Sequence, residues 1–168
     1  MNYCGIGSRN TPDEVLIQMH EVAFQLAKNG WTLRSGHADG ADMAFELGAK
    51  AGKGNMEIYI PWRGFNGASD QCIHTKPTEE DEQLAAKFHP AWNKLSSAAK
   101  LLMVRNTYQL FGNDYQTRSE FVICWTHNGN GQGGTGQAIR MANHYGIPVF
   151  DLGKRGSDQR FVNYINAA

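Results

Sequence analysis

The densest group of residues that could bind a ligand is the glycine-rich segment 127–137, HNGNGQGGTGQ. It lies between a predicted strand over 121–125 and a predicted helix over about 135–144. Glycines let backbone N–H groups approach an anion closely, and the start of a helix carries partial positive charge. We therefore predict phosphate binding by Gly133, Gly134, Thr135 and Gly136, with a tight surface turn as the alternative. The P-loop ending Gly-Lys-Ser/Thr is absent, which excludes triphosphate hydrolysis through that motif.

The same segment permits a dinucleotide interpretation. Gly129, Gly131 and Gly134 have GxGxxG spacing, and Asp151 closes the next predicted strand. In this variant the loop binds phosphate and Asp151 binds a ribose. The motif arises easily in a glycine-rich segment and follows the fourth predicted strand, so it is a variant of the nucleotide hypothesis.

A second polar segment, Gly7-Ser8-Arg9-Asn10, follows a predicted strand over 2–6. Arginine can contact phosphate oxygens through two N–H groups at once. A helix is predicted to follow, with Thr11 as the N-cap and Pro12 as the first helical residue. We expect Gly7, Ser8 and Arg9 to face the glycine-rich segment; the alternative is an arginine in a solvated turn.

Two carboxylates follow the third segment, Ser35-Gly36-His37-Ala38-Asp39-Gly40, in a predicted helix over about 41–51. Asp42 and Glu46 are one helical turn apart and share a face. They could bind ribose hydroxyls or act as an acid/base pair, with Ser35 and Gly36 in the nucleotide-binding loop. The alternative is that Asp39 and Asp42 only stabilise the helix start.

A polar pair, Arg105-Asn106, interrupts an otherwise apolar helical pattern over about 96–111. A guanidinium in such a position must reach solvent along its stem or meet an anion. Both outcomes are consistent with the sequence.

The elements that position these residues alternate along the chain. Strands are predicted over 2–6, 31–34, 56–60, 121–125 and 147–150, separated by helices, with 61–77 as a loop and a short helix over 157–165. This pattern predicts an α/β, Rossmann-like fold, an open and mostly parallel sheet with helices on both faces. Ligands of such sheets bind beyond the carboxyl ends of the strands, where the strand order reverses.

Length and composition limit the other possibilities. The 168 residues suit one domain, 1–168, and 16 Lys+Arg balance 16 Asp+Glu, so no overall field attracts nucleic acid or a membrane. No apolar run approaches a membrane span and no signal peptide is seen, so a cytoplasmic protein is expected. Three scattered cysteines predict neither a disulfide framework nor a metal site.

Taken together, these segments resemble the SLOG superfamily, which includes the LOG phosphoribohydrolases, the DNA-processing protein DprA and YpsA-type stand-alone proteins. The resemblance covers nearly the whole chain. It rests on the order and placement of short motifs: Gly5-Ile6-Gly7-Ser8-Arg9, Ser35 to Asp42 with Glu46, Pro61-Trp62, Arg105-Asn106, Gly133-Gly134-Thr135-Gly136 and Gly146-Ile147-Pro148-Val149.

The resemblance implies a pocket for a nucleotide, without a further cofactor. LOG enzymes hydrolyse the N-glycosidic bond of nucleoside 5′-monophosphates with an arginine that corresponds to Arg105 and a glutamate after the glycine motif. Here Gln137, Ala138, Ile139 and Arg140 follow that motif, without a carboxylate. A ribosyl transition state needs an anion or a base, so Asp42 or Glu46 would have to serve beside Arg105.

The expected partner is a small phosphorylated nucleoside or a dinucleotide, and the expected assembly is a homo-oligomer without membrane contact. Two alternatives to an N-glycosidase remain open. DprA binds single-stranded DNA in recombination, although zero net charge and the absence of a basic stripe argue against that activity here. A non-catalytic sensor or sequestering module would bind a nucleotide and release no base.

Overall fold

Six parallel strands form one open sheet in the order β4-β3-β2-β1-β5-β6. The computed structural model describes residues 1–168. The strands are β1 (Asn2–Gly5), β2 (Thr32–Ser35), β3 (Met56–Ile60), β4 (Ile73–His74), β5 (Val122–Cys124) and β6 (Val149–Asp151). The helices are α1 (Asp13–Lys28), α2 (Ala41–Ala51), α3 (Glu79–Lys87), α4 (Ser97–Phe111), α5 (Gly133–His144) and α6 (Ser157–Ala167). The predicted Rossmann-like α/β class is confirmed.

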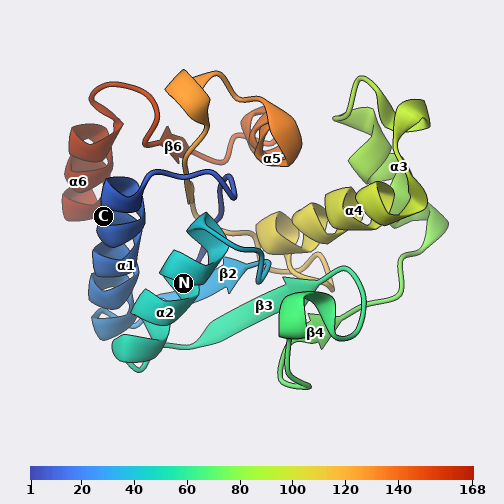
Figure 1. Ribbon diagram of the computed structural model, residues 1–168. Helices are drawn as coiled ribbons and strands as arrows, with labels where there is room; N and C mark the ends of the chain where they lie inside the picture. Colours follow the sequence, from blue (N-terminus) through green and yellow to red (C-terminus); the bar gives the residue numbers. More distant parts are fainter.

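Helices cover both faces of the sheet (Figure 1). Because side chains alternate across a strand, Tyr3 packs with Trp31 and Phe121 in a cluster on the side of α1, α2 and α6. Neighbouring Cys4 joins Met141 in a second cluster, on the side of α4 and α5. The sheet is therefore buried on both faces, as parallel sheets usually are.

The strand order reverses beside β1. The chain builds β2, β3 and β4 outward on one side, and then returns to place β5 on the other side of β1, with Cys4 opposite Val122 and Gly5 opposite Ile123. The loops that leave β1 and β5 therefore diverge at one edge of the sheet, which is where ligands of such folds bind.

Three local features differ from the sequence prediction. Residues 61–77 contain the two-residue strand β4, which pairs with Tyr59 and Ile60 and is too short to show a periodicity. Thr11 does not cap α1, because Pro12 holds the N-cap position and the Thr11 hydroxyl donates to Ser8 O at 2.6 Å. Helix α5 begins at Gly133, so the last glycines of the loop are helical.

Thr78 and Asp81 form a capping box at the start of α3. None of the helices has the length and apolar character needed to cross a membrane.

Candidate nucleotide-binding cleft

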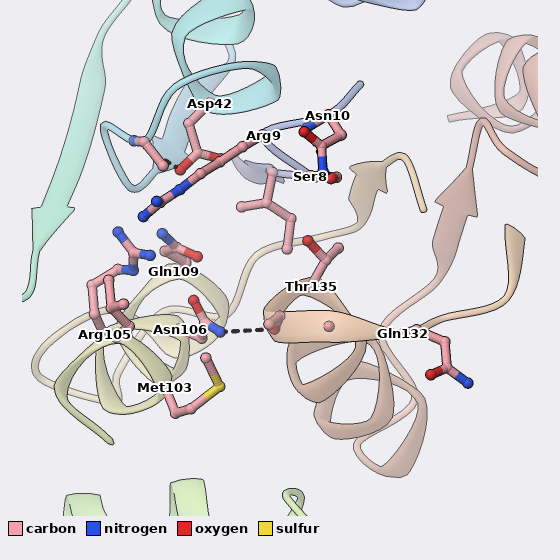
Figure 2. Close-up of a pocket in the computed structure, with 16 residues that line it drawn as sticks. Ser8, Arg9, Asn10, Asp42, Met103, Arg105, Asn106, Gln109, Gln132 and Thr135 are labelled. Atoms are coloured by element: carbon pink, nitrogen blue, oxygen red, sulfur yellow. Dashed lines mark hydrogen bonds between the residues drawn. The ribbon is translucent and has the colours of Figure 1, made fainter. Parts of the chain in front are cut away.

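A cleft of about 380 Å³ lies at the point where the strand order reverses (Figure 2). Its walls come from the loop after β1, the start of α2, the middle of α4 and the start of α5. The predicted site residues that line it are Gly7, Ser8, Arg9, Asp42, Arg105, Asn106, Gly133, Gly134 and Thr135. The structure thus brings together segments that lie far apart in the sequence.

Four predicted residues do not line this cleft. The Ser35 hydroxyl donates to Gly5 O at 2.6 Å and joins β2 to β1. Gly36 contacts the Arg105 side chain, which donates to its carbonyl oxygen. Gly136 is buried in the first turn of α5 against Gly131. Glu46 turns to His37, whose Nδ1 is 2.9 Å from its carboxylate. Glu46 therefore does not join Asp42 in the cleft.

Helix α5 presents an uncapped N-terminus to the cleft. Its N-cap residue, Gln132, makes no side-chain capping bond, and the first turn holds no acidic residue. The first amide groups of any α-helix lack partners inside the helix, and the helix dipole adds partial positive charge there. Backbone amides near Gly133, Gly134 and Thr135 can therefore receive an anion.

The loop before α5 is held in place by Asp151. This buried carboxylate accepts hydrogen bonds from the backbone N–H groups of Thr126 and Gly153 at 2.9 Å, and from the Thr126 hydroxyl. The Thr126 hydroxyl oxygen in turn accepts from Gly131 N at 3.0 Å. Asp151 is thus engaged in shaping the loop, whereas the dinucleotide variant assigns it to a ribose.

Asn106 fixes the distance between α4 and α5. Its side-chain amide donates to Gly134 O at 3.2 Å and to Gln137 Oε1 at 3.1 Å. Gln137, fully buried, donates onward to Ala85 O at 3.1 Å. Asn106 therefore lines the cleft chiefly as the residue that holds the start of α5 against α4 (Figure 2).

Arg105 carries a buried positive charge into the cleft. The residue is 8% exposed, and its Nη1 donates to Gly36 O at 2.6 Å and to Tyr59 O at 3.5 Å. No carboxylate lies within 4 Å of the guanidinium. The two salt bridges of the chain join Arg34 to Glu57 and His37 to Glu46. Burial lowers the pKa of Arg105, although arginine stays charged in proteins. The Arg105 side chain therefore does not extend along its stem into bulk solvent, which was one of the two outcomes that the sequence allowed.

Asp42 is the carboxylate of the cleft. It is 4% exposed, and Ala38 N donates to its Oδ2 at 3.2 Å. Burial raises the pKa of Asp42 to about 6, against the opposing effects of the Arg105 charge and the Ala38 hydrogen bond. A carboxyl that titrates near neutral pH can take up or release a proton during a reaction.

Gln109 lines the cleft and was missed by the sequence analysis. It lies on α4, one helical turn after Arg105, and is 1% exposed. The only signal in the sequence was an amide side chain in an apolar helical pattern, which is too common to single out.

The comparisons with known proteins show the fold. No protein-family model matches the chain, and no curated protein matches it in sequence. The Moco carrier protein of Chlamydomonas reinhardtii is similar in structure, with a TM-score of 0.54, 19% identity, and coverage of 99% of this chain and 86% of that chain. A second structure of that carrier gives a TM-score of 0.52 and 17% identity.

The DNA processing protein A of Helicobacter pylori, solved in a study of its single-stranded DNA binding, has a TM-score of 0.54 and 17% identity. The similarity covers 90% of this chain and 64% of that chain, so the present chain spans just under two thirds of it. DprA is among the proteins that the sequence resembles. The Rossmann-like fold implied by that resemblance is therefore shown.

Proposed function

We propose that the protein binds a small phosphorylated nucleoside in the cleft at the point where the strand order reverses. The phosphate would lie against the start of α5 and Ser8, with Arg105 anchoring the ligand. The observation that carries this proposal is the buried Arg105 guanidinium, which opens into the cleft without a carboxylate within 4 Å. A buried cation in that situation is stabilised by an anionic ligand.

If the protein is an enzyme, the reaction we propose is cleavage or transfer of an N-glycosidic bond. Asp42 is the carboxylate that the cleft offers to activate water or to stabilise a ribosyl cation. The position after the glycine motif holds Gln137, which is buried and hydrogen-bonded to neighbouring helices. It cannot replace a catalytic glutamate.

A carrier or sensor that releases no base is the non-catalytic form of the same proposal. The similarity to a Moco carrier protein makes the molybdenum cofactor one cargo to include in the test. Such a protein needs the same anion-binding cleft, but it does not need Asp42 to exchange a proton.

The experiment is to identify the small molecules released from the purified protein by mass spectrometry, and its molybdenum content by elemental analysis. Titration calorimetry then compares adenosine 5′-monophosphate with adenosine. We expect the monophosphate to bind at least tenfold more tightly, and Arg105→Met to weaken its binding. Arg155→Met, which removes an exposed arginine outside the cleft, is the matched control. Equal binding of the two ligands, or no binding of either and no released anion, contradicts the proposal.

Single-stranded DNA binding is the alternative suggested by DprA. It requires a mobility shift with a single-stranded oligonucleotide that weakens steeply as salt is added, because counterions are displaced from the phosphates. The zero net charge of the chain and the small volume of the cleft favour a small ligand instead. A shift that Arg105→Met abolishes would favour the DNA alternative.

A further inference from the structure

The inner end of the cleft contains a side-chain amide without any partner. Both the nitrogen and the oxygen of the Gln109 amide lack a hydrogen bond, although the residue is 1% exposed. Buried polar atoms are nearly always paired, so each exception requires an explanation. Since the side chain has both a donor and an acceptor, exchanging its two atoms does not remove the deficit.

Arg105 shares this deficit. Its Nε also lacks a partner. The two side chains meet at Gly36, where a Cβ atom would lie 2.2 Å from Arg105 Nη1 and 2.4 Å from Gln109 Nε2. The Arg105 and Gln109 side chains, from neighbouring turns of α4, therefore converge at Gly36, and only a glycine leaves room for them.

Arg9 adds a second positive charge at this point. Its side chain reaches from the loop after β1 toward Arg105 and Gln109, away from Thr135 (Figure 2). Burial contributes most to the lowered pKa of Arg105, and the charge of Arg9 lowers it further, while Asp42 opposes both. Neither arginine has a salt bridge, and Asp42 is the one acidic residue that lines the cleft. The expectation that Arg9 faces the glycine-rich segment therefore does not describe its side chain.

We propose that Arg9, Arg105 and Gln109 form a second anion subsite, so that the ligand carries negative charge at both ends. This inference rests on the proposed function. One phosphate lies at the start of α5, and a second phosphate or a carboxylate lies between the two guanidinium groups. That second group accepts from the Gln109 amide nitrogen and from Arg105 Nε, and it supplies the acceptors that these two buried nitrogens lack.

The test compares three ligands by titration calorimetry: adenosine 5′-monophosphate, adenosine 5′-diphosphate and adenosine 3′,5′-bisphosphate. The diphosphate carries both phosphates at one end, and the bisphosphate carries them at two positions of the ribose. We expect the bisphosphate to bind at least tenfold more tightly than either of the others. Arg9→Gln should reduce this preference to less than threefold.

The decisive variant is Gln109→Glu, which keeps the shape of the side chain and places a carboxylate between two arginines. Because the new charge pairs with Arg9 and Arg105, we expect an unfolding temperature no lower than that of the original protein. It should nevertheless lose the bisphosphate preference, which separates a lost subsite from a damaged fold. Gln159→Glu, on the exposed side of α6, changes net charge equally and should keep the preference.

Each other result contradicts the subsite. Equal affinities for the monophosphate and the bisphosphate overturn it while leaving the proposed function intact. If the diphosphate binds as tightly as the bisphosphate, the affinity depends on total charge and not on the positions of the two phosphates. If the preference for the bisphosphate survives Gln109→Glu, residues other than Gln109 cause it. Failure of all three ligands to bind overturns the proposed function as well.

Discussion

Arg105 donates a 2.6 Å hydrogen bond to the carbonyl oxygen of Gly36, a residue 69 positions earlier in the chain. The bond joins the middle of α4 to the loop after β2, and it sets the direction of the guanidinium in the cleft. The close approach depends on the absence of a side chain at position 36. Two segments that the sequence treats as separate signals are therefore one structural unit.

Gly36→Ala should displace Arg105. The added Cβ would lie 2.2 Å from Arg105 Nη1, much closer than atoms can approach. We expect the affinity for adenosine 5′-monophosphate to fall at least tenfold, measured by titration calorimetry. Urea unfolding of the same variant serves as the control for folding. An unchanged affinity in a folded variant would show that the orientation of Arg105 does not matter for binding.

Asp42 should make stability depend on pH. Its pKa is raised from the ordinary value of 3.8 to about 6, so the folded protein keeps a proton that the unfolded chain releases between these values. The contribution to stability is complete below pH 3.8 and is lost as the pH rises through 6, with a limit of roughly 3 kcal/mol.

Asp42→Asn should remove this dependence and unfold at higher urea concentration than the original protein at pH 8. Urea unfolding from pH 5 to 8 gives the measurement. Parallel pH profiles for the two proteins would mean that Asp42 titrates normally.

If the cleft is catalytic, Asp42 and Glu46 should differ in their effects. Asp42 lines the cleft, whereas Glu46 pairs with His37 outside it. We expect Asp42→Asn to lower the rate of base release from a nucleoside 5′-monophosphate at least a hundredfold with little change in affinity, and Glu46→Gln to change the rate less than fivefold. Chromatography of the released base provides the assay, and equal losses in both variants would contradict the assignment.

Asn106→Ala should destabilise the fold. It removes the hydrogen bonds to Gly134 O and Gln137 Oε1 and leaves buried polar atoms without partners. Such losses cost about 1–3 kcal/mol each. Asn143→Ala, at an exposed position of α5, is the control and should change the free energy of unfolding by less than about 0.5 kcal/mol. A difference smaller than that between the variants would mean that Asn106 does not hold α5 in place.

The alternation of strands and helices could be predicted because buried strands and amphipathic helices leave clear periodicities. Strand β4 could not, since two residues show no periodicity and pair only because β3 is already present. The predicted cap of α1 was wrong for a local reason: Thr11 has a suitable hydroxyl, but it donates to Ser8 O, three residues earlier in the same turn.

At the candidate site, the sequence indicated which loops would meet, because parallel strands end at one edge of the sheet. It could not indicate which way individual side chains turn. Glu46 lies on the same helical face as Asp42, but its carboxylate pairs with His37. Gln109 was overlooked because its importance comes from missing partners, which are visible only when every neighbour is in place.

The position of β5 beside β1 has a consequence for the order of folding. The first hundred residues contain four adjacent strands and could associate early, but one wall of the cleft comes from the loop after β5. A chain that is incomplete or partly unfolded therefore lacks a complete binding cleft. Any ligand that fits the cleft binds only the fully assembled sheet, so it raises, by mass action, the free energy needed to release the last two strands.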